Sequence, residues 1–173
     1  MIHIAVKKPG RFDRIGHRIT GDRKGQSSGV GWEFVHVGID DAARTAFTQI
    51  KPDEKAVSAT AFLKAAVADY SGLGVKVARV MTGSCYKSFA FARACRKLKI
   101  KHIRTKPHTP KTNGEAERFI QTSLREWAYA KAYQTSDARA QDLLPLDPPI
   151  QWASPARRPS LGLIRDNLLR LPS

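Results

Sequence analysis

Short hydrophobic runs separated by turn-forming residues predict three strands in the first third of the chain. Residues 2–6 form a β-type run, and residues 33–40 and 45–50 form two more, joined by a tight turn that contains Asp40, Asp41 and Arg44. Residues 7–32 separate the first two runs and hold six glycines and seven basic residues, as expected of a long, mobile, basic loop. The pattern therefore predicts one strand, a long excursion and then a hairpin.

From residue 58 onward the pattern changes to alternating helices and strands. Residues 58–70 place apolar side chains on one helical face, and two glycines then precede a predicted strand at 75–81. A second helix is predicted at 89–98, a short strand at 100–105, and a long helix at 114–133 with a clear apolar stripe. This order predicts an α/β fold in which helices cover a mixed sheet.

The charge of the chain is strongly positive and unevenly distributed. Thirty Lys and Arg residues against fifteen Asp and Glu residues give a net charge of +15, and the stretch from Tyr70 to Gly114 contains no acidic residue. A solvated charged face usually mixes both signs, whereas an excess of one sign attracts polyanions through counterion release. We therefore expect DNA or RNA as the partner, rather than a membrane or a small-molecule substrate.

The cysteines and histidines do not predict a zinc site. Cys85 and Cys95 lie ten residues apart, and together with His102 and His108 they match no zinc-ligand spacing. Reduced thiols are expected instead. No apolar run approaches the roughly 20 residues that a membrane helix needs, so we expect a cytoplasmic protein.

The segment at 109–119, TPKTNGEAERF, places acidic residues at the start of a predicted helix inside this basic region. Thr112 and Glu115 have the spacing of a capping box, and Glu117 follows in the second turn. Helix physics alone gives Glu117 an ordinary explanation, because an exposed acidic residue is favourable near the positive end of the helix dipole. Its position alone does not make it catalytic.

Four segments together resemble bacterial insertion-sequence transposases of the retroviral-integrase superfamily, the DDE enzymes. They read IHIAVKKPGRF, VHVGIDDAAR, VMTGSCYKS and HIRTKPHTPKTNGEAERFIQTSLREWAYA, and the last is the most specific. The resemblance implies a ribonuclease H-like integrase catalytic core over residues 1–144, with a mixed five-stranded sheet flanked by helices. Residues 145–173 are expected to form an irregular, proline-rich tail. The resemblance also implies a truncated copy, since family members usually carry a helix-turn-helix region ahead of the core.

The resemblance supplies only one residue of a three-carboxylate site. In the family, two aspartates and a glutamate hold Mg²⁺ ions for the phosphoryl transfers of DNA integration and transposition. Glu117 matches the glutamate, whereas Ala5 stands at the first aspartate, and Thr82 is followed directly by Gly83 where the family has Thr-Asp-Asn-Gly. We expect Glu117 to be a vestigial third carboxylate and the only metal ligand, in a DNA-binding core that no longer binds Mg²⁺ productively.

Several basic and polar residues are candidates for contacts with DNA phosphates. They follow the first predicted strand or belong to the segment around Glu117, where the helix N-terminus adds backbone amides. The candidates are Lys7, Lys8, Lys106, Lys111, Asn113 and Arg118.

Two other functions remain open at this point. Asp40 or Asp41, at the end of the second predicted strand, would join Glu117 in an active metal-dependent nuclease or transposase, although hairpin turns also favour Asp. A basic RNA-binding protein without catalytic activity would explain the charge but not the segment at 109–119. The sequence also leaves open the target DNA, the formation of a homo-oligomer, and stable folding.

Overall fold

The computed structural model contains five strands and three helices within the residues that it describes. These residues are 1–13, 31–40, 42, 45–83, 86–105, 117–118, 121–122, 127–128 and 132–143. The elements run in the order β1 (Ile2–Lys7), β2 (Phe34–Asp40), β3 (Ala46–Lys51), α2 (Ala56–Gly72), β4 (Arg79–Thr82), α3 (Phe89–Lys97), β5 (Lys101–Arg104) and α5 (Ser136–Leu143). None of the described helices is long and apolar enough to cross a membrane.

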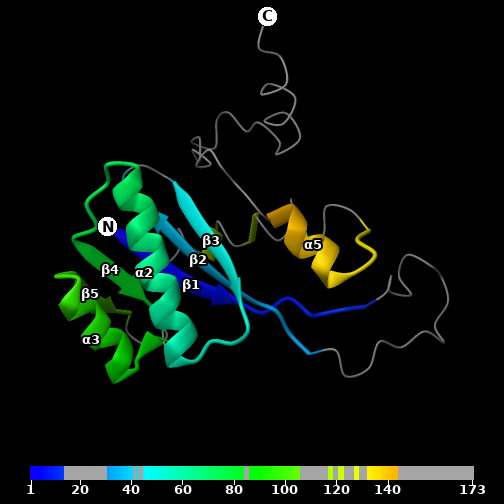
Figure 1. Cartoon of the computed structure of the whole chain (residues 1–173), viewed down its shortest axis with the longest axis horizontal. Helices are drawn as coiled ribbons and strands as arrows, with labels where there is room; N and C mark the ends of the chain where they lie inside the picture. The colour runs from blue at the N-terminus through cyan, green and yellow to red at the C-terminus, as the bar shows by residue number, and fades with distance from the viewer. Residues whose placement is uncertain are drawn as a thin grey trace, which may run out of the picture.

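The five strands form one mixed sheet in the order β3-β2-β1-β4-β5 (Figure 1). The first three strands make an antiparallel meander, and β4 and β5 then add in parallel on the other side of β1. The two parallel additions require crossovers, which α2 and α3 provide. The predicted fold class, a mixed five-stranded sheet flanked by helices, is confirmed.

Each face of the sheet has its own hydrophobic core. On one face, Ile2 and Ile4 of β1 and Val80 of β4 pack against the buried sides of α2 and α3. On the other face, the alternate residues of β2 pack against Trp127, Ala128 and the α5 residue Leu143; the β2 residues are Val35, Val37 and Ile39. Because side chains alternate along a strand, neighbouring residues of β1 belong to different cores. We call these the α2–α3 face and the Trp127 face.

The hairpin between β2 and β3 is closed by Asp40, as its turn position predicts. The Asp40 amide donates to the Thr45 carbonyl at 2.9 Å, and the Asp40 Oδ2 atom accepts from the Ala42 amide at 3.2 Å. Tyr70 of α2 reinforces the same hairpin, because its hydroxyl lies 2.9 Å from the Gly38 carbonyl oxygen and 3.1 Å from that of Thr45.

Two predicted elements differ from the observed ones. The strand predicted at 75–81 is only Arg79–Thr82, because the Val75 amide bonds to the Tyr70 carbonyl at 2.8 Å and keeps this segment attached to α2. Within the helix predicted at 114–133, the structure describes eight residues: Glu117, Arg118, Gln121, Thr122, Trp127, Ala128, Ala132 and Tyr133. The last two are no longer helical. The helix α5 was not predicted.

The predicted loop at 7–32 begins and ends in paired backbone. Lys7 is still part of β1, Gly10 and Trp32 form an antiparallel bridge, and the Glu33 amide donates to the Pro9 carbonyl at 3.0 Å. The Arg11 amide likewise bonds to the Gly31 carbonyl at 3.0 Å. The β1–β2 ribbon therefore extends beyond the named strands, and the middle of the predicted loop lies outside the described residues.

Candidate catalytic face of the sheet

Strand pairing brings together the two positions at which aspartates were expected. In the parallel pair of β1 and β4, Ile4 lies opposite Thr82, so that Ala5 and Gly83 are the next residues on the two strands. Ala5 is half-buried, and Gly83 follows the last residue of β4. A β-carbon built on Gly83 would meet no atom within 4 Å. Two aspartates at these positions would therefore sit side by side at the end of the sheet.

Ala5 lies on the Trp127 face of the sheet. It packs against the core that includes Trp127 and Ala128, which lie ten and eleven residues after Glu117 along the chain. Glu117 itself is exposed and lies in a helical stretch.

Asp40, the last residue of β2, lies on the opposite face from Ala5 and beside the first residue of β1. Its partner across the β1–β2 pair is Ile2, whereas the partner of Ala5 is Val37, three positions away and thus about 10 Å along the strand. Directly opposed residues share a face, so Asp40 points to the α2–α3 side with Ile2. The Asp40 carboxylate is also only 2% exposed and lies 3.2 Å from the N-terminal ammonium group. The structure does not bring Asp40 toward Ala5, and Asp41 lies outside the described residues.

The side chains at the expected aspartate positions do not fit a divalent metal. Mg²⁺ takes oxygen ligands, but Ala5 and Gly83 offer no side-chain oxygen. Among the described residues, no group of three His, Cys, Asp or Glu side chains is arranged to hold a metal ion. Glu117 is the one member of the expected carboxylate set that this sequence supplies.

A buried hydrogen-bond network lies directly behind Ala5. The Tyr86 hydroxyl is 3.2 Å from the Ala5 carbonyl oxygen and 2.9 Å from Nδ1 of His36. The other ring nitrogen of His36 lies 3.1 Å from the Asp53 carbonyl oxygen, so in the neutral tautomer with a proton on Nε2 the single Tyr86 hydroxyl proton is shared between Nδ1 of His36 and the Ala5 carbonyl oxygen. Burial lowers the pKa of His36 below its usual value. This network fixes the backbone of β1 at the candidate site.

Hydrogen bonds of Thr82 to His102 and Thr105 fix the end of β4. The Thr82 Oγ1 atom lies 2.8 Å from Nε2 of His102, and the Thr82 carbonyl accepts from the Thr105 amide at 3.0 Å. Burial, followed by repulsion from Arg104, lowers the pKa of His102. The neutral imidazole therefore serves as a partner for the Thr82 hydroxyl.

The candidate phosphate contacts are only partly described. Lys7 is exposed at the end of β1 and follows Ala5 by two positions on the same face. Lys8 is ion-paired with Glu54 and lies over the ring of Phe34, 5.4 Å from its centroid. Arg118 is exposed beside Glu117 in sequence, whereas Lys106, Lys111 and Asn113 lie outside the described residues.

An open hollow beside these lysines was not predicted. It has a volume of about 390 Å³ and is lined by Val6, Lys7, Lys8 and Trp32. The Trp32 side chain is 62% exposed, which is unusual for so large an apolar group. A tryptophan preceded by glycines at the end of a glycine-rich loop was the available signal in the sequence.

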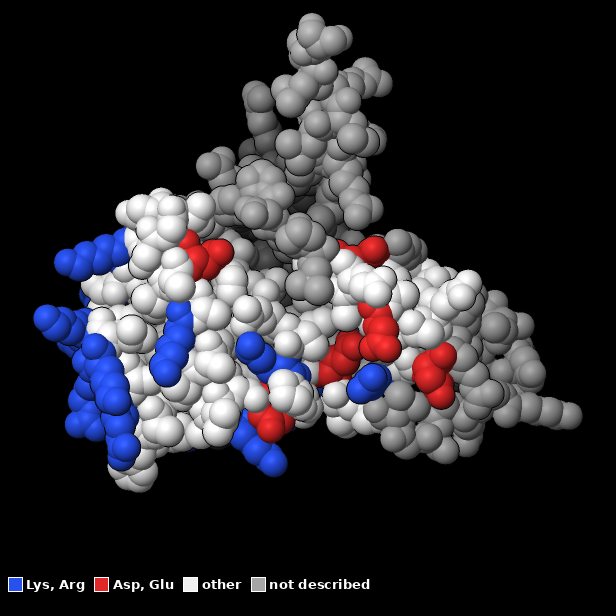
Figure 2. Space-filling model, in the orientation of Figure 1, with Lys and Arg blue, Asp and Glu red and all other residues white. Residues whose placement is uncertain are grey.

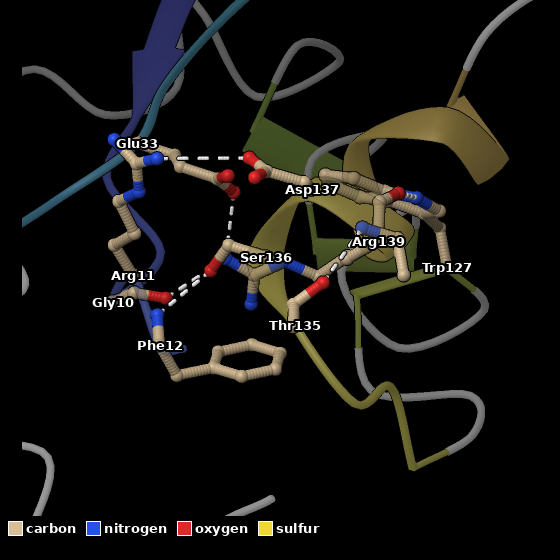
Figure 3. A network of polar contacts seen from close by, with 10 residues as sticks. Gly10, Arg11, Phe12, Glu33, Trp127, Thr135, Ser136, Asp137 and Arg139 are labelled. Atoms are coloured by element: carbon tan, nitrogen blue, oxygen red, sulfur yellow. Dashed lines mark hydrogen bonds and ion pairs between the residues drawn. The ribbon is translucent and has the colours of Figure 1, made fainter. Parts of the chain in front are cut away.

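A buried ion pair fastens α5 to the extended β1–β2 ribbon (Figure 3). The Arg139 guanidinium donates to Glu33 Oε2 at 2.7 Å and to the Gly10 carbonyl at 2.8 Å. Arg139 is only 2% exposed and Glu33 only 8%. Figure 3 also shows Ser136 beside Phe12, where the Phe12 amide donates to the Ser136 hydroxyl at 2.7 Å.

Aromatic rings complete the surroundings of Arg139. Its guanidinium carbon lies 4.8 Å from the centroid of Phe12 and 5.9 Å from that of Trp127. The Trp127 indole N–H donates to the Arg139 carbonyl at 2.8 Å. Arg139 thus connects the ribbon, α5 and the core of the Trp127 face. Sequence patterns did not predict this contact, because a single Arg in a short polar helix resembles a solvent-exposed residue.

Comparison with known proteins supports the same fold. Residues 98–144 match the family described as integrase core domain. No protein with a curated description matches the sequence. Among solved structures, a chain of the simian T-cell lymphotropic virus intasome in complex with PP2A regulatory subunit B56 gamma superposes with a TM-score of 0.57 at 20% identity, covering 82% of this chain. The match spans 45% of that viral chain.

Two isolated catalytic cores are also similar. The BIV integrase catalytic core domain matches with a TM-score of 0.50 at 19% identity, over 63% of this chain and 70% of that one. The HTLV-2 integrase catalytic core domain in complex with magnesium, in a dimeric form, matches with a TM-score of 0.50 at 16% identity, over 81% and 79%. Residues 98–144 thus resemble the integrase core domain family, and the chain shares its ribonuclease H-like fold with these integrase catalytic cores.

Proposed function

We propose that this chain is a DNA-binding integrase or transposase core that has lost metal-dependent strand transfer. The observation that carries the proposal is the pairing of β1 with β4, which makes Ala5 and Gly83 neighbours at the expected aspartate positions. Neither side chain can ligate a metal, and Glu117 supplies only one carboxylate. Two-metal phosphoryl transfer needs ligands that bridge and position both ions, so a single carboxylate is insufficient.

The alternative that keeps activity through Asp40 is disfavoured by geometry. Asp40 points to the α2–α3 face, whereas Ala5 packs on the Trp127 face. A carboxylate on the other side of the sheet cannot share a metal ion with ligands beside Ala5 and Glu117. Asp40 also already closes the hairpin turn to Ala42.

The proposed DNA contacts rest on charge and on position. Lys7 is exposed on the same face as Ala5, and the net charge of +15 favours a polyanionic partner. Lys8, Lys106, Lys111, Asn113 and Arg118 complete the set of proposed DNA contacts. The magnesium named in the HTLV-2 structure belongs to that protein, and we propose that the present chain binds DNA without it.

A combined binding and cleavage experiment tests this function. The purified chain is expected to bind duplex DNA equally well in EDTA and in Mg²⁺, with an affinity that falls steeply as salt rises. It is expected not to nick supercoiled plasmid in Mg²⁺ or Mn²⁺. Nicking that disappears in Glu117→Gln would show retained catalysis and contradict the proposal. A preference for structured RNA over duplex DNA would favour an RNA-binding protein instead.

A further inference from the structure

The outer side of α3 combines exposed cations with an exposed aromatic ring. Phe91, Ala94 and Cys95 face the core, whereas Phe89, Arg93, Arg96 and Lys97 are exposed. Their positions are i, i+4, i+7 and i+8, which places them along one stripe of the helix. Phe89 is 89% exposed, the highest exposure among the large hydrophobic residues described. This stripe is therefore both basic and apolar.

The positive charge continues past the end of the helix onto the edge of the sheet. Lys99 lies in the turn after α3, and Lys101 begins the edge strand β5, where its partner on β4 is Arg79. All three side chains are exposed. Because Val80 belongs to the core of the α2–α3 face, the neighbouring Arg79 and its partner Lys101 point to the other face of the sheet, so the charge continues from the outer side of α3 around the end of the β4–β5 edge. We call the six cations together the basic ridge: Arg79, Arg93, Arg96, Lys97, Lys99 and Lys101. Figure 2 shows Lys and Arg side chains gathered over the part of the molecule that contains α3 and the β4–β5 edge.

The basic ridge lacks acidic partners within the described part of the chain. The ion pairs found there involve the N-terminus, Lys8, Arg11 and Arg139, and none involves a residue of the ridge. No Asp or Glu occurs between Tyr70 and Gly114 to supply one locally. Uncompensated like charges repel one another, so a ridge of this kind is stabilised when a polyanion binds.

The dipole of α3 explains only part of this charge. Cations in the last turn favourably oppose the negative end of a helix, which accounts for Arg96 and Lys97. That effect falls off within one turn, and Lys101 and Arg79 belong to strands. It also does not explain the exposed ring of Phe89 at the other end of the helix. A ligand that takes both cations and an aromatic contact explains all of them.

We propose that the basic ridge is a second DNA-binding surface, which contacts the sugar-phosphate backbone separately from the former catalytic centre. Arg79 precedes Gly83 by four residues, so this surface begins about 13 Å along β4 from the expected metal position. The stripe on α3 spans nine residues, or about 13 Å, enough to follow several phosphates. The partner is DNA bound through its backbone, with Phe89 packing on a sugar or base edge. This inference rests on the proposed function.

Salt dependence of binding to a duplex DNA of random sequence tests the ridge directly. Removing two phosphate contacts with Arg93→Gln and Lys97→Gln together should reduce the slope of log affinity against log salt by roughly 1.8, about 0.9 for each contact. Lys55→Gln with Lys64→Gln is the matched control, because both lysines are exposed on or beside α2 and the net charge changes equally. The control should leave the slope nearly unchanged.

Phe89→Ala provides a second, independent measurement. It should weaken binding without altering the salt slope, because it removes an apolar contact and no charge. Its thermal unfolding should match that of the parent, since the ring is exposed. If the parent binds DNA and the two double variants lose slope equally, the ridge is not a specific surface, although the proposed function stands. If the parent binds no DNA, both proposals fail.

Discussion

At the scale of single residues, two small side chains determine what the candidate site can do. Ala5 and Gly83 occupy neighbouring positions where β1 pairs with β4, and neither supplies a carboxylate there. Space is not the obstacle, because a β-carbon at Gly83 would meet nothing within 4 Å. Ala5 is half-buried, so an aspartate there would be partly desolvated, at a cost in free energy that a bound cation would offset.

Restoring both aspartates is expected to restore metal binding. The double variant Ala5→Asp with Gly83→Asp should be less stable than the parent in EDTA, because clustered carboxylates repel and one is half-buried. Added Mg²⁺ should stabilise it by about 2.7 kcal/mol at 100 times the dissociation constant. Thermal unfolding with and without Mg²⁺ measures this effect.

The control for this experiment removes the third carboxylate from the restored protein. Adding Glu117→Gln to the double variant should abolish most of the stabilisation by Mg²⁺, while the parent should show none. An equal Mg²⁺ response with and without Glu117 would mean that Glu117 does not face the two strand positions. No response in the double variant would refute the assignment of Ala5 and Gly83.

His36 is expected to make the stability of the fold dependent on pH. Burial lowers its pKa in the folded protein, so the unfolded chain binds a proton more readily than the folded one. Stability is therefore retained above the unfolded pKa of about 6.5 and lost as the pH falls below it. Chemical unfolding at pH 7.5 and pH 5.5 should show the loss, and His36→Gln should reduce it.

His102 contributes a dependence of the same sign, because burial and Arg104 also lower its pKa. The variant His36→Gln should therefore retain part of the effect, and combining it with His102→Gln should remove more. A parent protein that is equally stable at both pH values would show that these imidazoles are protonated without cost in the folded state.

At the scale of elements, the docking of α5 depends on one buried ion pair. Arg139→Met would leave Glu33 buried without its cation, which typically costs about 3–5 kcal/mol. The free energy of unfolding measured with urea should fall by this amount. A second change, Glu33→Leu, should recover much of the loss, because an apolar pair of similar volume avoids the unpaired charge.

Arg11 offers a matched comparison from the same network. Its ion pair with Asp137 is exposed, with side-chain exposures of 50% and 79% and a distance of 3.6 Å. Arg11→Gln should therefore change stability by about 1 kcal/mol or less. Equal effects of the Arg11 and Arg139 variants would contradict the structural role given to the buried pair.

Elements with a clear local pattern were predictable from the sequence, and those held by distant contacts were not. The strands at 2–6 and 45–50 and the helix at 89–98 have periodic apolar residues, and each was found within two residues of its predicted ends. The helix α5 has the polar sequence SDARAQDL, and it is fixed by Arg139 and Ser136 contacts to residues more than 120 positions away. No local pattern contains that information.

The candidate site was predictable in part for the same reason. The resemblance of short segments pointed to Ala5, to the junction of Thr82 and Gly83, and to Glu117. The pairing of β1 with β4 then places Ala5 beside Gly83. The exclusion of Asp40 required the strand register, because one position along a strand changes the face on which a side chain lies. The sequence could propose Asp40, but the fold decides its face.

At the scale of the whole molecule, much of the positive surface charge lies apart from the two hydrophobic cores. The apolar residues on both faces of the sheet form the cores that hold the domain together, whereas much of the positive charge lies at the exposed edge of α3, β4 and β5 (Figure 2). Neither Ala5 nor Gly83 belongs to the buried residues of these cores. The proposed loss of catalysis is therefore compatible with an intact fold and with the proposed binding of DNA.

The contact between α5 and the β1–β2 ribbon has a consequence for the order of folding. The Phe12–Ser136 hydrogen bond spans 124 residues and the Gly10–Arg139 bond spans 129, so both close very large loops. During synthesis, the ribbon emerges long before its partner helix exists. Contacts of such long range form slowly. We therefore expect Glu33 to stay solvated while the sheet assembles, and its pairing with Arg139 to form as a late step of folding.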